Sequence, residues 1–428
     1  MTPLLWLYQT VAPATSVLLT MARPFSAKLR AGLDGRRGLA KRFAAAADNL
    51  QGCVWIHASS VGEYEQARPV IQALQERSTP APPIVVTHFS PSGFAYAQKR
   101  PCGDFHDYLP LDSSWAMRRA IRLWNPRLLV FVKFDCWPNQ ILAATEHGVP
   151  VVLIAGTLQP RSRRLAGWAR PFWRDLFNRF AHLGVCTEDD RERFVQELGV
   201  RSPVTVTGDT RAEQVILRFA AARDGVVATR LQALGDRLLI LGSTWPPDEA
   251  LWLPILADLL DRFADLRIVL APHEPRPERL TSLERDLRRG GIGITRLSHW
   301  LARPEPLPAT CRCILVDSVG VLAEIYRAGT LAYVGGSFTS GVHNTMEPAI
   351  AGQPVLFGPV IQNAVEAGAL VRQGAGFVVR EPAGARERAG ELLADPARLR
   401  ALGEAARQVV LSQRGATEKS LALLEPYL

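Results

Sequence analysis

The sequence of 428 residues has few cysteines, only six, and no two of them form a Cys-x-x-Cys pair. Several of the six lie within apolar, strand-like runs, where a cysteine behaves as a small buried hydrophobic residue. The spacing therefore predicts neither a disulfide framework nor a zinc site. This cysteine usage is typical of a protein in a reducing cytoplasm.

Short motifs of several enzyme classes are also missing. The sequence contains no Walker loop and no G-x-S-x-G elbow, which excludes P-loop kinases and acyl hydrolases of that type. Four histidines at predicted strand ends lie on separate segments, and none belongs to an H-x-x-x-H or D-x-D pair. These are His57, His88, His273 and His343. We expect no metal site and no other cofactor.

Positive charge is concentrated near the N-terminus. The segment from Arg23 to Arg42 holds seven basic residues and one acid, Asp34, in a chain of net charge +9. It follows the uncharged, largely apolar run Pro3–Ala22. Such an order predicts a membrane contact with a cytoplasmic basic flank that attracts anionic lipid. A nucleic-acid partner is not expected, because no other basic stripe interleaved with aromatic residues occurs.

The run Pro3–Ala22 is only marginally long enough to span a bilayer. A true span, a shallow interfacial anchor and a helix packed on the protein's own core all remain open. A cleaved signal peptide fits less well, because no basic residue precedes the apolar stretch. We assign residues 1–45 to this anchor and its basic flank.

The rest of the chain is long enough for two α/β domains. Short apolar runs alternate with helix-length segments, as in βαβ units with a mainly parallel sheet. The first set of expected strands comprises Cys53–Ala58, Ile84–His88, Leu128–Lys133, Val151–Ala155, Leu183–Cys186 and Val204–Thr207; the second comprises Leu238–Gly242, Arg267–Leu270, Cys313–Val316, Leu331–Val334 and Pro354–Phe357. We expect two Rossmann-like, doubly wound domains, at residues 46–210 and 236–428, joined by a linker at 211–235. Ligands of such sheets bind beyond the carboxyl ends of the strands, so two facing domains should form a cleft.

The first candidate loop follows the strand Cys53–Ala58. Ser60 and Glu63 have the spacing of a capping box, so Glu63 could do no more than cap its helix. Alternatively, Gly62 allows a substrate to approach the backbone, and Glu63 acts as a general base. Spacing alone favours the cap.

The second candidate loop follows Leu331–Val334. Gly335, Gly336 and Ser337 precede a helix expected to begin around Asn344, with Glu347 in its first turn. Free N–H groups at a helix N-terminus suit a phosphate, so this loop is a candidate nucleotide site, although Asn344 and Glu347 could also form a cap.

Four further places hold polar residues at strand ends or at the domain junction. Ser243 and Thr244 precede a helix that begins at a proline, and Arg211 places a basic side chain at the junction. His273 and Asp135 follow two other strands, and Arg161 lies beyond the strand Val151–Ala155. Each signal is weak alone.

Together these loops resemble the transferases of 3-deoxy-D-manno-octulosonic acid (Kdo), a family with the GT-B arrangement of two Rossmann-like domains. The resemblance covers essentially the whole chain, including the apolar N-terminus with its basic flank. The motifs that carry it are His57–Glu63, Trp137–Asn139, Thr207–Asp209, Gly242–Thr244, Gly335–Phe338, His343–Asn344 and Glu347–Pro348.

The resemblance implies that CMP-Kdo is the donor and a lipid A precursor in the inner leaflet is the acceptor. By the same analogy Glu63 is the general base, with Ser60, Gly62, Asp135 and Arg161 on the acceptor side, and attack inverts the anomeric carbon. The donor would be held by Gly335, Gly336, Ser337, Asn344, Glu347, Ser243, Thr244, Arg211 and His273. The implied location is the cytoplasmic face of the inner membrane, in lipopolysaccharide biosynthesis.

The sequence departs from the family pattern at several loops. Trp245 stands where many members have His, and Asp135-Cys136 precedes Trp137 where Glu and an apolar residue are usual. The alternatives are another GT-B sugar transferase acting on lipids, a nucleotide-sugar epimerase, or an inactive lipid-binding module.

Overall fold

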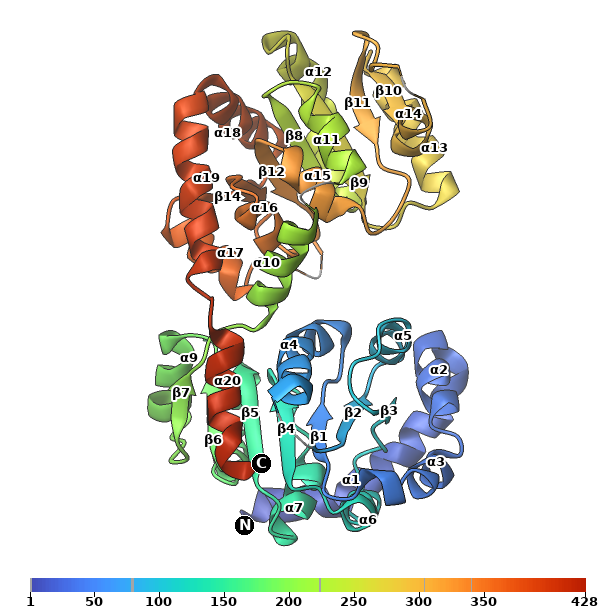
Figure 1. The fold of residues 1–428 in the computed structure, drawn as a ribbon, viewed down its shortest axis with the longest axis vertical. Helices are drawn as coiled ribbons and strands as arrows, with labels where there is room; N and C mark the ends of the chain where they lie inside the picture. The colour runs from blue at the N-terminus through green and yellow to red at the C-terminus, as the bar shows by residue number, and fades with distance from the viewer. Residues whose placement is uncertain (1, 78–80, 223–224, 304, 340) are drawn as a thin grey trace. The chain divides into compact units, whose positions relative to one another are not determined.

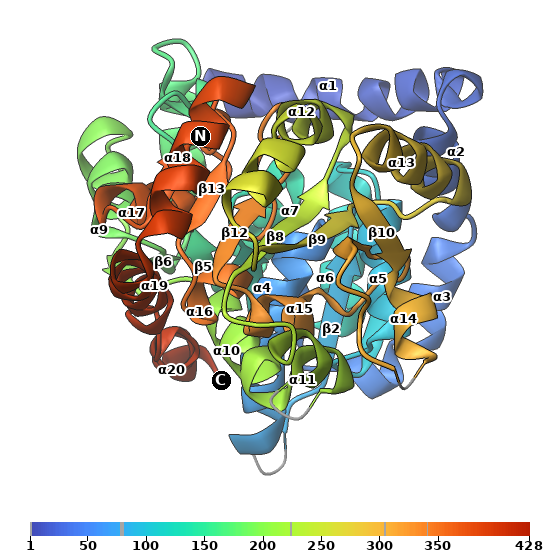
Figure 2. The same ribbon diagram turned by 90° about the horizontal axis from the view of Figure 1, so that it is seen from above.

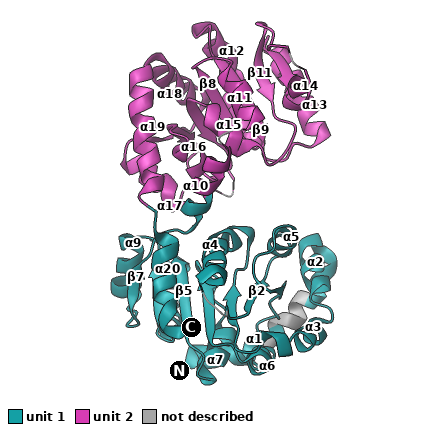
Figure 3. Cartoon of the chain, viewed as in Figure 1, with its two compact units in different colours: residues 1–214, 413–428 teal, residues 215–412 magenta. Residues whose placement is uncertain are grey.

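The computed structural model describes residues 2–77, 81–222, 225–303, 305–339 and 341–428, without the side chains of Pro13 and residues 15–19. The chain forms two compact units (Figure 3). Unit 1 comprises Met1–Gln214 and Gln413–Leu428, and unit 2 comprises Val215–Ser412.

The sheet of unit 1 has seven parallel strands in the order β3-β2-β1-β4-β5-β6-β7 (Figure 1). Six of the seven were expected from the sequence, and β3 was not. The strands are β1 (Val54–His57), β2 (Ile84–His88), β3 (Phe105–Tyr108), β4 (Leu128–Val132), β5 (Val151–Gly156), β6 (His182–Val185) and β7 (Val204–Val206). The helices between them are α4 (Val61–Arg77), α5 (Pro91–Lys99), α6 (Ser114–Trp124), α7 (Pro138–Glu146), α8 (Arg170–Phe177) and α9 (Glu188–Glu192).

Both faces of this sheet are buried, as a doubly wound fold requires. Trp55 of β1 joins one apolar cluster with α3, α6 and α7, whereas its neighbours Val54 and Ile56 join another with α4. Parallel strands buried on both faces read as continuous apolar runs, which is why the sequence reveals them.

The N-terminal segment belongs to unit 1 rather than forming a separate part. It forms α1 (Pro3–Met21), α2 (Ala27–Gly35) and α3 (Leu39–Ala45), and Figures 1 and 2 show α1 along an outer side of the unit, leading to α2. Leu5 is fully buried, and the Tyr8 hydroxyl donates to Asp112 at 2.8 Å. Among the described residues, no helix is both long and apolar enough to cross a membrane.

Several side chains of the basic flank form ion pairs or hydrogen bonds within unit 1. Arg42 forms a bidentate ion pair with Asp107, with contacts of 2.6 and 2.8 Å, and Arg23 pairs with Asp34 at 2.6 Å. The Arg36 guanidinium donates to the backbone oxygens of Leu109, Gly32 and Phe89. Lys28 and Lys41 remain exposed.

The sheet of unit 2 also has seven parallel strands, in the order β10-β11-β9-β8-β12-β13-β14. They are β8 (Leu238–Thr244), β9 (Arg267–Pro272), β10 (Gly293–Arg296), β11 (Cys311–Leu315), β12 (Leu331–Val334), β13 (Val355–Phe357) and β14 (Gly376–Val378). Five of them were expected, and the edge strands β10 and β14 were not. The helices of this part are α11 (Val226–Gln232), α12 (Pro246–Arg262), α13 (Pro277–Arg289), α14 (Leu297–Leu301), α15 (Leu322–Ala328), α16 (Met346–Ile350), α17 (Val365–Arg372), α18 (Pro382–Ala394) and α19 (Pro396–Leu411).

The two boundaries of unit 2 compare differently with the expected domains. The first falls inside α10 (Arg211–Ala221), within the expected linker 211–235. Residues 413–428, expected in the second domain, belong to unit 1. The reason is α20 (Ala416–Leu424), whose buried Leu421 and Leu424 join the apolar cluster of α4 and β1.

Candidate active site

Each sheet contains one point where the strand order reverses. In unit 1, β1 pairs with both β2 and β4, and in unit 2, β8 pairs with both β9 and β12. Ligands of open α/β sheets bind beyond the carboxyl ends of the strands at such a switch point. The loops after β1 and β4, and those after β8 and β12, are therefore the places to look for chemistry.

Glu63 lies in the first turn of α4, directly after β1. The backbone N–H of Ser60 donates to Glu63 Oε2 at 3.0 Å, which is the glutamate half of a capping box. The carboxyl is only 4% exposed. Glu63 therefore does cap its helix, and the question is whether its surroundings equip it for proton transfer as well.

Those surroundings raise the pKa of Glu63 from 4.5 to about 7, first through burial and then through the negative charge of Asp135. The N–H of Ser60 and the Lys133 ammonium act in the opposite direction. A carboxyl with a pKa near neutrality is matched to general-base work near neutral pH. A surface cap would keep an ordinary pKa.

Asp135 follows β4, on the other side of the switch point from Glu63. Burial raises its pKa, while a hydrogen bond from the Ser59 hydroxyl and the charge of Arg164 lower it. Lys133, at the end of β4, has φ of +68°, a left-handed conformation that is costly for a residue with a side chain. Such strain at the end of a strand is common where side chains are held for function.

The arginine nearest these carboxyls is Arg164, not Arg161. Arg164 donates to the backbone oxygen of Phe134 at 2.7 Å and lies over the Trp173 ring at 4.4 Å. Its charge acts on both Asp135 and Glu63. Arg161, the residue chosen from the sequence, is exposed. The three closely spaced arginines of this segment could not be ranked without the fold.

Gly62 borders open space. A Cβ added there would meet no other atom within 4 Å, so the protein's own packing does not demand glycine. This is compatible with the expected close approach of a substrate to the backbone.

A chain of hydrogen bonds fixes the loop after β4. Trp137 Nε1 donates to His57 Nε2 at 3.1 Å, and His57 Nδ1 lies 3.1 Å from Thr87 Oγ1. An indole N–H only donates, so His57 carries its proton on Nδ1 and donates it to Thr87. Burial lowers the pKa of His57 to about 3, which keeps the ring neutral. His57 is thus a structural histidine that holds Trp137.

In unit 2, Asp248 joins the loops that follow β8 and β12. Its Oδ2 accepts from the N–H of Trp245 at 2.8 Å and from that of Gly336 at 3.0 Å, and its Oδ1 accepts from the Tyr333 hydroxyl at 2.5 Å. The expected proline-started, capped helix is therefore present as α12. Asp248 was not among the residues expected from the sequence, because the contact that joins the two loops depends on tertiary position.

The last two residues of β8 are notable for different reasons: Ser243 for its backbone conformation and Thr244 for its side-chain contact. Ser243 has φ of +53°, while the Thr244 hydroxyl donates to the buried Glu249 at 3.0 Å. Glu249 in turn forms an ion pair with Arg279.

The paired glycines are explained by packing within the protein. A Cβ on Gly335 would lie 2.4 Å from the backbone oxygen of Ser243, and one on Gly336 would lie 2.8 Å from the His343 ring. Gly336 also has φ of +97°. Beside them, the fully buried Ser337 hydroxyl has no partner among the described residues. It is an unused polar group at the switch point.

The helix expected at Asn344 is shorter and begins later. It is α16, which starts at Met346 and has five residues, and the Asn344 side chain accepts from the Met346 N–H at 3.0 Å. Glu347 is therefore the second residue of the helix, so Asn344 and Glu347 do not form the cap that their spacing also allowed. So short a helix also lends little macrodipole to a phosphate.

The two remaining donor-side candidates lie in different surroundings. Arg211 belongs to unit 1, where its guanidinium forms an ion pair with the buried Asp209: Nε and Nη2 both donate to Oδ2, at 3.0 and 2.6 Å. His273 follows β9 in unit 2, and its ring stacks on His343 at 4.2 Å. Within the described ranges, no three His, Cys, Asp or Glu side chains form a group that could hold a metal ion.

Comparison with known proteins identifies the family. A family model described as 3-deoxy-D-manno-octulosonic-acid transferase matches residues 32–214. A 3-deoxy-D-manno-octulosonic acid transferase of Bordetella pertussis is 31% identical over 89% of this chain and 88% of its own. A protein of the same name from Chlamydophila psittaci is 34% identical over 75% of this chain and 73% of its own.

Solved structures share the fold at low identity. A putative UDP-N-acetylglucosamine 2-epimerase from Listeria monocytogenes covers 88% of this chain and 96% of its own at 14% identity, with a TM-score of 0.62. A glycosyltransferase from Rickettsia africae covers 88% and 98% at 10% identity, with a TM-score of 0.57. The fold is thus GT-B-like and is common to epimerases and transferases. The sequence relatives decide between them: this chain belongs to the family of 3-deoxy-D-manno-octulosonic acid transferases and is a glycosyltransferase.

Proposed function

We propose that this enzyme moves Kdo from CMP-Kdo to the glucosamine disaccharide of a lipid A precursor, with Glu63 as general base. The acceptor hydroxyl attacks the anomeric carbon and gives its proton to Glu63, while CMP leaves with the electron pair of the broken bond. Attack opposite the leaving group inverts the anomeric carbon. The observation that carries the proposal is the buried Glu63 at the switch point, with its pKa raised to about 7.

Asp135 and Arg164 complete the acceptor side of this proposal. The charge of Asp135 contributes to the raised pKa of Glu63. Arg164, partly buried, supplies a positive charge beside both carboxyls. Ser60 orients Glu63 through its backbone N–H, and Gly62 leaves room for the sugar.

The donor is proposed to lie at the switch point of unit 2. Ser243 and Thr244 follow β8, and the glycine loop with Ser337 follows β12, so backbone and hydroxyl groups of both loops are available to the cytidylate. Asn344 and Glu347 would bind its sugar hydroxyls. We further propose that transfer requires no divalent cation.

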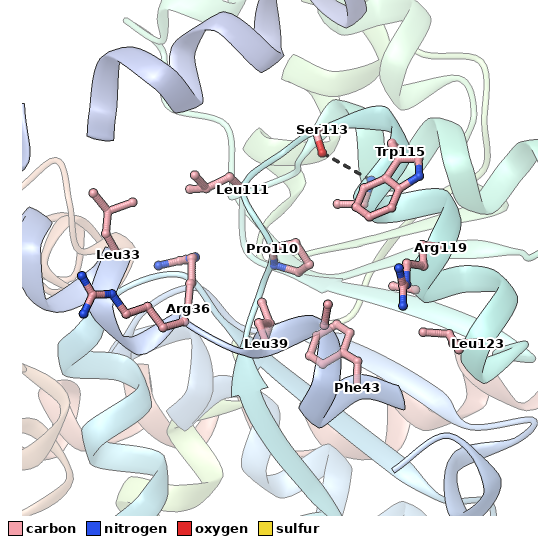
Figure 4. A pocket seen from close by; sticks show the side chains of 14 residues that line it. Leu33, Arg36, Leu39, Phe43, Pro110, Leu111, Ser113, Trp115, Arg119 and Leu123 are labelled. Carbon is pink, nitrogen blue, oxygen red and sulfur yellow. Dashed lines mark hydrogen bonds between the residues drawn. The ribbon is translucent and has the colours of Figure 1, made fainter. Parts of the chain in front are cut away.

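We also propose that one side of unit 1 contacts anionic lipid at the cytoplasmic face of the inner membrane. Two observations support it. First, α1 leaves Trp6 60% exposed, and beyond its end Phe25 is 89% exposed, close to the basic residues Lys28 and Arg30. Second, an apolar pocket of about 490 Å³ opens between α2, α3 and α6, and Figure 4 shows Trp115 and Arg119 of α6 on one side of it, with Leu33 and Arg36 on the other.

The test is incubation of the full-length protein with CMP-Kdo and a lipid A precursor, with the product mass measured. A mass increase by one or more Kdo residues supports the proposal. Parallel incubation with UDP-N-acetylglucosamine tests for an epimerase. Turnover of the UDP sugar without Kdo transfer would replace the proposed substrate, and lipid binding with no nucleotide binding would indicate an inactive module.

A further inference from the structure

Three aromatic rings meet at the switch point of unit 2. The rings of His343 and His273 stack with centroids 4.2 Å apart and planes 6° apart, and Trp245 lies 4.9 Å from His273 at 29°. Trp245 and His343 are inclined by only 25°, with centroids 6.4 Å apart, and Trp245 Nε1 donates to His343 Nε2 at 2.8 Å. His273 thus lies over a hydrogen-bonded, nearly coplanar pair.

The direction of that hydrogen bond fixes the protonation of His343. An indole Nε1 carries a hydrogen and cannot accept one, so His343 Nε2 must accept and must be unprotonated. In a neutral imidazole the single proton is then on Nδ1. His343 Nδ1 has no hydrogen-bond partner among the described residues and is not among their fully buried unpaired atoms, so it keeps some exposure.

Contacts with the neighbouring backbone hold the His343 ring in this position. A Cβ at Gly336 would lie 2.8 Å from His343 Cδ2, so the backbone of the glycine loop already contacts the ring. The His343 backbone N–H donates to the Gly335 oxygen at 3.0 Å. Gly336 and Trp245 are both held by Asp248. The ring and its indole partner are therefore held by one network.

The charged and titratable groups that face His343 do not favour a cation. Burial and the neighbouring His273 lower the pKa of His343 to about 4, against the opposing charge of Asp248. Burial also lowers the pKa of His273, against Glu274. Protonation of His343 at Nε2 would in addition set two donors, N–H against N–H, in the place of the 2.8 Å hydrogen bond.

We propose that Trp245 is a positioning residue that keeps His343 neutral with its proton on Nδ1, so that His343 presents one fixed N–H to an anionic oxygen of the bound nucleotide sugar. The ligand half of this inference rests on the proposed function. A histidine at position 245 could donate or accept and would itself titrate, whereas an indole donates at every pH. The consequence is a donor whose strength does not change across the physiological range.

The first test needs neither substrate nor activity. Nitrogen NMR of the full-length protein with labelled histidine reports which ring nitrogen carries the proton, and His343→Gln identifies the signal by its disappearance. The wild type should show a single tautomer, protonated at Nδ1, with no titration between about pH 5 and 8. Trp245→Phe keeps an aromatic ring but removes the donor, so His343 should become a mixture of tautomers with a higher pKa. Trp168→Phe, at a 77% exposed position of unit 1, is the matched control.

The second test measures CMP affinity by calorimetry across the same pH range. CMP changes its own phosphate charge near pH 6, so each variant is compared with the wild type at each pH. At pH 8 Trp245→Phe should bind CMP several-fold to about tenfold more weakly, approaching the loss of one hydrogen bond to a charged group. Near pH 5.5 the difference should shrink, because a protonated His343 in the variant donates again.

The outcomes distinguish the role of Trp245 in fixing the His343 tautomer from the contact of His343 with the nucleotide. A wild-type His343 protonated at Nε2, or unchanged tautomers in Trp245→Phe, would overturn the role of Trp245 whatever the enzyme binds. Unchanged CMP affinity in Trp245→Phe, with altered tautomers, would overturn the contact with the nucleotide. A wild type that binds no CMP would reject the proposed donor and with it that contact, while the NMR result would still decide the role of Trp245. Melting temperatures check that both tryptophan variants are folded.

Discussion

Replacing Glu63 by glutamine separates its two roles. Glutamine retains an oxygen that accepts the Ser60 N–H, now found at 3.0 Å from Glu63 Oε2, so the cap should survive. It cannot accept a proton. We therefore expect CMP affinity close to that of the wild type and transfer slowed by at least about 10²-fold, the low end of the contribution of a positioned general base.

Glu63→Gln should also change how stability depends on pH, which the same substitution at a surface cap with an ordinary pKa would not do. The pKa of Glu63 is about 7 in the folded protein against the usual 4.5, so the folded state binds the proton more tightly and stability is greatest below pH 4.5. As the pH rises from there to about 7, stability falls by about 1.4 kcal/mol for each pH unit, or ~3 kcal/mol in all. The glutamine variant does not titrate at this position and should avoid that loss.

The assay is urea unfolding at pH 5 and pH 8, together with transfer rates under saturating CMP-Kdo. Glu63→Gln should unfold at a higher urea concentration than the wild type at pH 8, and the two should converge toward acid pH. Glu76→Gln, on an exposed position of the same helix, should change neither rate nor stability. Near-normal transfer by Glu63→Gln would refute the catalytic role and move the search to Asp135 or His273. Unchanged stability at pH 8 would refute the raised pKa.

Three further predictions follow from the same surroundings. Asp135→Asn removes a charge that raises the pKa of Glu63, so the acid limb of kcat/KM should move to lower pH; an unmoved limb would mean that the two carboxyls are not coupled. Transfer at full rate in the presence of a chelator is expected, and a loss restored by magnesium or manganese would contradict it. Trp6→Ser with Leu7→Ser, which spares the buried Leu5 and the hydrogen-bonded Tyr8, should shift protein from anionic vesicles to the supernatant at unchanged melting temperature, whereas Trp168→Phe should not.

Most of the strands that the sequence revealed are buried on both faces, and β7, an edge strand, is the exception. β1 and β4, for example, consist almost entirely of apolar residues, because helices cover both sides. The three that escaped notice are edge strands. β3 carries His106 and Asp107 in four residues, and β10 and β14 are short and begin with glycine. An edge strand has one neighbour and less burial, so no apolar run is required of it.

Whether a site residue could be predicted from the sequence depended on how local its contacts are. Glu63, which is fixed by local geometry in the first turn of its helix, could be placed as a cap from spacing alone. Choices that depend on tertiary position could not: Arg164 rather than Arg161 faces the carboxyls, and Asn344 binds the backbone two residues on instead of starting the helix. The ring pair of Trp245 and His343 joins residues 98 positions apart in the chain, and no periodicity reveals such a contact.

The chain leaves unit 1 once, within α10, and returns to it at Gln413. Unit 2 is thus an insertion in unit 1, and the last helix is part of the first fold. A fragment that stops at residue 214 would lack α20 and would expose the apolar residues of α4 that α20 covers. A fragment spanning 215–412 would contain only residues of unit 2. Residues 413–428, supplied as a separate peptide, should bind the fragment that stops at residue 214 through Leu421 and Leu424 and restore its cooperative unfolding. The order of synthesis matters too, because α20 must be synthesised before the first domain can close its core.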